Sequence, residues 1–227
     1  SWINKKIKDE LTSLIELKNL ENHNPHIRAL AYRIYESNGV VKREEVKNFV
    51  NKLEQNDRKI LRSKGVKFGR YHIFLFKLFK PKAVSLRTLL WKNFNQKYMD
   101  LEPPQFGLNF INEDKKLNKD FMLMCGFEKF DSYYVRIDIL ERLFLMIIDK
   151  NKNNIKEIKL VPEMLNLLGC NKENFLKLME KMGYKWFSKD QEIYFKYNLK
   201  KKFKNIQKNK NINEDNPFNI LKEIRIK

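Results

Sequence analysis

The chain has 227 residues, of which 42% are hydrophobic, and a formal net charge of +19 at pH 7. The hydrophobic share suffices for a packed core, and a charge so far from zero favours a polyanionic partner: nucleic acid, acidic lipid or an acidic protein. No signal peptide and no apolar run of about 18 residues occurs, so we expect a cytoplasmic protein that is neither secreted nor membrane-spanning.

The positive charge is concentrated in two segments. Residues 58–99 hold twelve basic side chains and residues 193–213 hold seven, with no acidic residue in either segment. The rest of the chain balances, with 28 basic and 28 acidic residues. A general drift of the composition toward lysine would scatter the excess basic residues along the whole chain. Their clustering therefore indicates surfaces that were selected for an anionic partner.

The first part of the chain predicts helices. The chain begins with Ser and Trp and without Met, so we expect a piece of a longer protein. Apolar residues at helical spacing predict a helix over residues 4–20. Asn24 before Pro25 is typical of a helix start, and this second helix is expected to end before an Asn-Gly pair. A third helix is expected over residues 43–63.

The stretch RSKGVKFGRYHIFLFKLFKPK, residues 62–82, combines seven basic and five aromatic residues with no acidic one. Its β-forming residues predict a hairpin over residues 66–76, with Gly69 at the turn because glycine tolerates a positive φ. Basic side chains bind phosphates and aromatic rings stack on bases, as binding of single strands requires. The alternatives are core packing for the phenylalanines and a solvated face without a partner for the charges.

A helix is expected from Pro81 through Phe94. Residues 100–120 look like a loop, and residues 126–136 predict a second hairpin. These elements complete a helical region that carries the basic hairpin.

The order of elements that follows is informative. Helices are expected over residues 137–149, 162–169 and 172–182, a strand over 157–161, and a hairpin over 184–197. This order is typical of a winged helix-turn-helix, which meets nucleic acid through its second helix and its wing. Use of the module for packing or protein contact is the alternative.

We therefore predict an α+β fold that is mainly α, a helical bundle with a β-hairpin followed by a winged-helix-like module. The expected parts are a helical region with the basic hairpin (1–125), the winged-helix-like module (126–199), and a basic linker with a C-terminal helix (200–227). The sequence shows no internal repeat.

Catalytic signatures do not occur in the chain. It contains no P-loop, no G-x-S-x-G, no H-E-x-x-H and no Rossmann glycine pattern. His23 and His26 fit surface or capping positions better than a metal site, and His72 fits a solvated or core-edge position. Cys125 and Cys170, without any CxxC pair, are expected as free buried thiols. We expect no catalytic and no metal-binding residue, and the chain by itself is not expected to be an enzyme.

Eleven basic residues are the candidates for nucleic-acid contacts, and Arg70 at the hairpin turn is the best single phosphate contact. The candidates are Arg62, Lys64, Lys67, Arg70, Lys80, Lys82, Arg87, Lys177, Lys181, Lys185 and Lys189. The last four lie in the second helix and the wing of the winged-helix-like module, where Glu173 and Glu180 share the helix face.

Five segments carry a resemblance to a known family. They are RALAYRIYESNGVV, LRSKGVKFGRYHIFLFKLFKPKAVSLRTLLW, VRIDILERL, VPEMLNLLGCNKENFLKLMEKMGYK and NPFNILKEI. In this order, over most of residues 27–224, they resemble the C-terminal region of alphaproteobacterial superfamily-two helicases, relatives of the mitochondrial degradosome RNA helicase. None of these segments is a catalytic motif.

The resemblance implies two RecA-like motor domains ahead of this region, with ATP and Mg²⁺ bound there and no cofactor here. The chain would be a non-catalytic nucleic-acid-binding accessory region of an ATP-dependent RNA or DNA helicase of the DEAD/DEAH type. Its expected partners are single-stranded or structured RNA or DNA, the motor domains and a nuclease, with no membrane. The alternatives are a protein-interaction scaffold that docks a nuclease or ribonucleoprotein, and a free-standing winged-helix DNA-binding protein.

Overall fold

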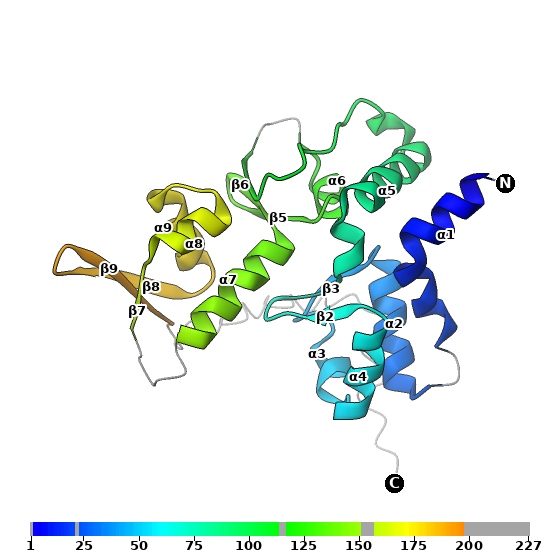
Figure 1. Ribbon diagram of the computed structural model, residues 1–227, viewed down its shortest axis with the longest axis horizontal. Helices are drawn as coiled ribbons and strands as arrows, with labels where there is room; N and C mark the ends of the chain where they lie inside the picture. Colours follow the sequence, from blue (N-terminus) through cyan, green and yellow to red (C-terminus); the bar gives the residue numbers. More distant parts are fainter. Residues whose placement is uncertain (1, 21–22, 114–116, 151–156, 198–227) are drawn as a thin grey trace, which may run out of the picture.

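A computed structural model describes residues 2–20, 23–113, 117–150 and 157–197. Within these ranges the fold is α+β with helices predominating and three small antiparallel sheets, so the expected fold class is confirmed. Figure 1 shows three successive groups of elements, coloured blue to cyan, blue-green to green, and yellow-green to orange. We call them the first, second and third units. None of the described helices is long and apolar enough to cross a bilayer.

The first unit follows an N-terminal helix α1 (Trp2–Ile15) and a short 3-10 helix η1 (Glu16–Asn19). Its elements are α2 (Pro25–Glu36), β1 (Val40–Lys42), α3 (Lys47–Asn51), α4 (Gln55–Ser63), β2 (Val66–Phe68) and β3 (His72–Leu75). Helix α2 begins as predicted, because the Asn24 side chain accepts a hydrogen bond from the His26 amide at 2.9 Å. The predicted hairpin over residues 66–76 is confirmed as the antiparallel pair β2–β3.

The second unit begins after a 3-10 turn η2 (Phe76–Phe79). Its elements are α5 (Pro81–Phe94), η3 (Gln96–Tyr98), β4 (Phe110–Asn112), α6 (Lys119–Met124), β5 (Phe127–Phe130) and β6 (Tyr133–Arg136). The hairpin predicted over residues 126–136 is confirmed. The sequence predicts a boundary between two parts of the chain after residue 125. Strand β4 lies before this boundary, yet it pairs with β6, which lies after it.

The third unit has the order of elements that the sequence predicts. It consists of α7 (Ile137–Lys150), β7 (Ile158–Lys159), α8 (Pro162–Leu168), α9 (Lys172–Lys181), β8 (Tyr184–Lys189) and β9 (Glu192–Tyr197). In Figure 1 the β8–β9 hairpin projects away from the other units at the left.

All three units repeat one topology. In each unit the single first strand pairs with the second strand of the later hairpin, giving the orders β1-β3-β2, β4-β6-β5 and β7-β9-β8. A glycine with nearly the same positive φ precedes each hairpin: Gly65 at 89°, Gly126 at 90° and Gly183 at 89°. The sequence shows no internal repeat, but the three sheets share one strand order, although among the described residues the second unit has one helix, α6, where the others have two. The repeat is hidden in the sequence because it consists of glycine positions and burial alternation rather than shared residues.

Two stretches depart from the predicted elements. Residues 43–63 form two helices instead of one, because Glu54 and Asp57 make a capping box that starts a new helix at Gln55. The stretch expected as a loop, residues 100–120, contains β4 and the start of α6. Strand β4 pairs with β6, a partner that a local pattern does not reveal.

The inner face of each sheet packs against the helices of its own unit. In the first unit Ile73 and Leu75 of β3 join the helical residues Leu30, Ile34 and Leu61 in one core. The same arrangement recurs around Tyr134 in the second unit and Phe195 in the third. Each unit therefore has its own apolar centre.

The outer faces of the first two sheets join the units together. Val40 and Phe74 on the first sheet pack with Ile137, at the start of α7. Tyr133 and Val135 on the second sheet are part of the core of the third unit. Burial of both faces fixes the order in which the units stack.

Candidate nucleic-acid interface

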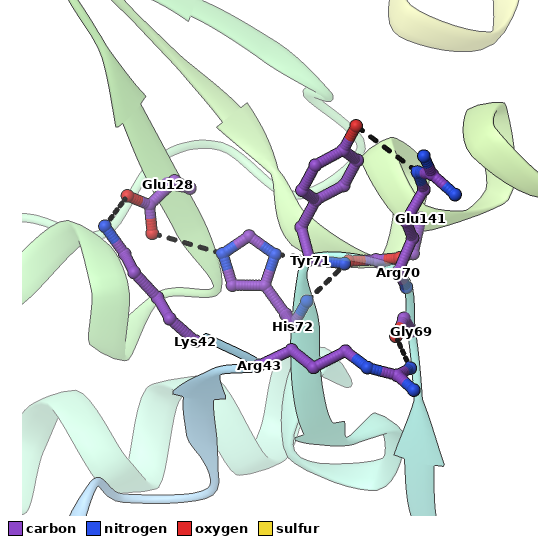
Figure 2. A network of polar contacts seen from close by, with 8 residues as sticks. All are labelled: Lys42, Arg43, Gly69, Arg70, Tyr71, His72, Glu128 and Glu141. Carbon is purple, nitrogen blue, oxygen red and sulfur yellow. Dashed lines mark hydrogen bonds and ion pairs between the residues drawn. The ribbon is translucent and has the colours of Figure 1, made fainter. Parts of the chain in front are cut away.

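The turn of the β2–β3 hairpin is built around the buried carboxylate of Glu141 from α7. This carboxylate accepts hydrogen bonds from three consecutive backbone amides: Arg70 at 2.5 Å, Tyr71 at 2.9 Å and His72 at 2.7 Å. Figure 2 shows the carboxylate beside these residues and the Arg43 guanidinium below, which donates to the Gly69 carbonyl at 2.6 Å. The amides of the turn are thus occupied by a side chain of the protein itself, and they leave only the side chains of the turn for an outside anion.

Gly69 is required for a different reason from the one that the sequence suggests. Its φ is not in the positive range, in contrast to the six other glycines of the chain. Instead, a Cβ at this position would lie 2.4 Å from Cδ of Glu141 and 2.7 Å from the His72 carbonyl oxygen. The glycine makes room for the carboxylate.

His72 connects Glu141 to the second unit (Figure 2). Its Nδ1 lies 3.2 Å from Glu141 and its Nε2 lies 3.3 Å from Glu128, which also pairs with Lys42 at 2.8 Å. Burial disfavours the charged ring, but the hydrogen bonds to Glu128 and Glu141 outweigh it and raise the pKa of His72. Burial likewise opposes the charge on Glu128, yet the hydrogen bonds from His72 and Lys42 lower its pKa. His72 is only 3% exposed, so it lies inside a polar network that joins two units.

The side chain of Arg70 points away from this network and is exposed. Its guanidinium lies 5.6 Å from the ring centroid of Tyr71 and 5.3 Å from that of Tyr197, the last residue of β9. It also approaches the Tyr71 hydroxyl at 3.4 Å. Stacking on two rings limits the positions available to the guanidinium while leaving its charge without a carboxylate partner among the described residues.

Tyr71 fastens the hairpin to the third unit. Its ring lies 4.5 Å from that of Phe144 in α7, and its hydroxyl lies 3.4 Å from the carbonyl oxygen of Met182 at the end of α9. Burial raises the pKa of Tyr71, so its hydroxyl stays neutral and can donate to that carbonyl. The two parts with the most candidate nucleic-acid contacts, the basic hairpin and the third unit, are therefore adjacent.

Seven of the eleven candidate cations are exposed and have no ion pair with any residue that the structure describes. They are Arg62, Lys67, Arg70, Lys80, Lys82, Lys185 and Lys189. Arg62 lies over the ring of Phe68 at 5.6 Å, which places it beside β2. These residues can contact phosphate without first breaking an ion pair with a described residue.

Three further candidates form ion pairs. Lys64 pairs with Glu16 at 3.6 Å, Lys177 with Glu173 at 2.6 Å and Lys181 with Asp131 at 2.7 Å. All three pairs are at the surface, where solvent screens the charges and such a pair contributes little to stability. These lysines are weaker candidates because each already has a partial counter-charge.

Arg87 is not a surface contact. It is 3% exposed, and its guanidinium donates to the carbonyl oxygens of Leu78 at 3.1 Å and Asn38 at 2.7 Å. Burial lowers its pKa to about 10. Arg87 is thus a structural cation that holds α5 against the turn after α2, and its assignment to nucleic-acid binding is wrong because phosphate cannot reach it.

The aromatic residues of the first basic segment divide between core and surface. Phe74 is buried and stacks on Phe79 at 5.3 Å, in agreement with core packing, whereas Phe76 is 45% exposed. The two cysteines are free, Cys125 buried and Cys170 half-buried, and burial raises their pKa values to about 12 and about 11. Most of the second basic segment, and the helix expected after Pro217, lie outside the described residues.

Sequence reasoning missed Glu141, Tyr197 and Lys196. Glu141 carried a readable signal: it is an acidic residue at a core position of the apolar helix α7, between Leu140 and Leu143, which are fully buried. Tyr197 and Lys196 carried no such signal, because their role depends on which strands β9 joins.

The fold and this surface define an α+β protein of three stacked units with an exposed basic and aromatic face. No family model matches the chain, and no solved structure matches it. The chain is similar to an alanine–tRNA ligase from Wigglesworthia glossinidia brevipalpis, with 25% identity over 239 aligned positions. The alignment includes 90% of this chain and spans 26% of the length of that relative.

This similarity corrects the expected descent from superfamily-two helicases, which is wrong: the match is to a tRNA ligase rather than to a helicase. None of the short segments that suggested the helicases contains a catalytic motif. The expectations that depended on it, namely RecA-like motor domains, bound ATP and Mg²⁺, and a nuclease partner, lose their basis.

Proposed function

We propose that this chain is a non-catalytic RNA-binding module whose phosphate contacts are centred on Arg70. The observation that carries the proposal is the position of the Arg70 guanidinium, exposed and stacked on Tyr71 and Tyr197 without a carboxylate partner among the described residues. Ordering a flexible arginine side chain reduces its conformational entropy. The Arg70 side chain is already ordered in the folded protein, so binding does not have to order it. A pre-positioned guanidinium suits a phosphate, which it can bind through two N–H donors.

The surroundings of Arg70 extend the positive surface in two directions. Lys67 lies on β2 of the same hairpin, and Arg62 lies over Phe68 of that strand. The contact with Tyr197 joins this surface to the third unit, whose strand β8 carries the exposed Lys185 and Lys189 on its outer face. A nucleic-acid strand bound at Arg70 would therefore find further cations on its own hairpin and others on the neighbouring unit.

RNA is favoured over DNA by the similarity to an alanine–tRNA ligase. That protein's name specifies tRNA as a substrate, and at 25% identity we transfer to this chain only the class of partner. The composition of the basic segment predicts a single-stranded or structured nucleic acid and does not distinguish RNA from DNA, so the choice of RNA rests on this similarity alone.

Fluorescence anisotropy with a labelled single-stranded RNA tests the proposal. The triple variant Arg62→Glu, Lys67→Glu and Arg70→Glu is expected to lose about tenfold or more in affinity. Its plot of log affinity against log salt should also become shallower, by about 0.7 for each lost phosphate contact.

The matched control reverses three exposed lysines on other elements: Lys5 and Lys8 in α1, and Lys119 in α6. It makes the same change in net charge, so it should retain most of the affinity. Equal losses in the two variants would reduce the binding to a general effect of charge, and full binding by the first variant would refute the proposal.

A further inference from the structure

The outer face of the third sheet is the exception among the three units. In the first two units the equivalent faces are closed, because Phe74 and Val135 are 4% and 0% exposed. The register makes Lys196 the counterpart of these two residues, since it lies opposite Lys185 as Phe74 lies opposite Lys67. Lys196 is exposed, and within the described part of the chain no neighbouring unit covers it.

This open face carries an aromatic pair at its centre. Phe187 on β8 and Tyr194 on β9 are directly opposite in the register, and their rings stack at 6.0 Å with an interplanar angle of 19°. Both rings are partly exposed, and neither packs against the buried core that holds Tyr184 and Phe195 on the inner face. Two large rings on a solvated sheet face contribute little to folding, but they offer flat surfaces on which bases can stack.

Lysines surround the ring pair. Lys185 and Lys196 face each other across β8 and β9 next to the rings, and neither has an ion pair with a described residue. Like charges that are directly opposite destabilise a sheet, so folding does not account for this pair, whereas a phosphate that bridges it would. Lys196 also lies over the Phe187 ring at 5.5 Å, so its ammonium group must move aside when a base stacks on that ring, and it can then contact the flanking phosphate.

The acidic residue on this face is neutralised. Glu192 of β9 forms an ion pair with Lys159 of β7, the strand that flanks Tyr194. It also accepts a hydrogen bond from the Tyr194 hydroxyl at 3.0 Å, which fixes the position of that ring. The face is therefore cationic on balance, with two oriented rings.

We propose that the outer face of the β7-β9-β8 sheet is a stacking platform for single-stranded RNA. Bases lie on Phe187 and Tyr194, and the flanking phosphates contact Lys185 and Lys196. This inference rests on the proposed function and makes it specific, because paired bases within a duplex cannot present their flat faces to the sheet.

The test uses a single-stranded RNA that contains 2-aminopurine, whose fluorescence is quenched when the base stacks. The double variant Phe187→Leu and Tyr194→Leu retains apolar side chains without aromatic rings. We expect it to lose the quenching and about tenfold or more in affinity for the single strand. Its salt dependence should stay as in the unmodified protein, because stacking releases no counterions.

The second variant, Lys185→Gln with Lys196→Gln, should change the salt dependence of the affinity and leave base stacking intact. Its log–log salt slope should fall by about 0.7 for each phosphate contact removed, while 2-aminopurine is still quenched at low salt. Thermal unfolding of both variants checks that the sheet is intact.

The outcomes separate this inference from the proposed function. If the leucine variant binds and quenches like the unmodified protein, while the Arg62, Lys67 and Arg70 reversal abolishes binding, the platform is refuted and RNA binding stands. If the unmodified protein binds no single-stranded RNA, the proposed function itself fails. Equal loss of duplex and single-strand binding in the leucine variant also contradicts the platform.

Discussion

The carboxylate of Glu141 occupies the space where residue 69 would carry a side chain, since a Cβ on Gly69 would lie 2.4 Å from Glu141 Cδ. The two residues are 72 positions apart, in the first and third units. Their fit brings the basic hairpin to α7 and so to the third unit. The arrangement of the proposed RNA-binding surface therefore depends on one glycine and one carboxylate.

We expect Gly69→Ala to destabilise the protein by about 1–3 kcal/mol, because the methyl group must displace Glu141 from the amides of the turn. Urea unfolding measures the change. In a Glu141→Ala background the same substitution should cost less, since the carboxylate is gone and only the close contact with the His72 carbonyl oxygen, at 2.7 Å, remains. Equal costs in both backgrounds would show that the clash is not the cause.

Glu141→Gln should lower the free energy of unfolding by about 2–3 kcal/mol. The substitution keeps the size of the side chain, but it replaces one acceptor oxygen with an NH₂ group that faces the backbone amides of Arg70, Tyr71 and His72. Glu163→Gln, an exposed change in the first turn of α8, serves as the control and should stay within about 0.5 kcal/mol.

Stability should fall as the pH rises above the ordinary pKa of histidine, 6.5. The folded pKa of His72 is raised, so its contribution is fully present below 6.5 and is lost as the pH rises through the folded value. Glu128 has a lowered pKa, so its contribution is present above its ordinary value of 4.5 and is lost as the pH falls through the folded value. Urea midpoints should therefore be highest between these limits.

The matched variant for this pH dependence is His72→Gln, which cannot titrate. The alkaline decline should flatten in this variant, whatever its absolute stability. The groups that face His72 are Lys42, Glu128 and Glu141. An unchanged slope above pH 6.5 would contradict the assignment to His72.

Arg87→Met should reduce stability by about 2–3 kcal/mol and leave RNA affinity unchanged. The carbonyl oxygens of Leu78 and Asn38 lose their charged donor. A buried acceptor without a donor costs the protein the free energy of its lost hydration. Lys82→Met, on the exposed side of the same helix, should stay within about 0.5 kcal/mol. A loss of RNA affinity in folded Arg87→Met would restore this residue to the binding surface.

The sequence predicts the elements of this fold well where the signal is local. The Asn24 cap, the β2–β3 hairpin and the whole order from α7 to β9 follow from caps, glycines and alternation. The sequence does not predict strands β1 and β4, because each is three residues long and forms only by pairing with a distant hairpin. The repetition of the three units is not predicted for the same reason.

The candidate site shows a similar division. Counting charges finds Arg70, Lys67 and Lys185, because exposed cations need no fold to be recognised. Counting charges also selects Arg87, because a buried arginine and an exposed one look alike in a sequence. The register that places Phe187 beside Tyr194, and Lys185 beside Lys196, depends on the strand pairing and could not be read from the chain.

The lysine pair on the third sheet also affects self-association. Stacked arrays tend to extend by adding like elements to an uncovered end, and natural arrays stop by making the last surface polar. Lys185 and Lys196 face each other on the outer face of the last sheet that the structure describes, so a second copy docked on this face would bring four ammonium groups together. The same side chains that attract a polyanion thus oppose self-association through this face, and we expect the purified protein to stay monomeric until a polyanion bridges two copies.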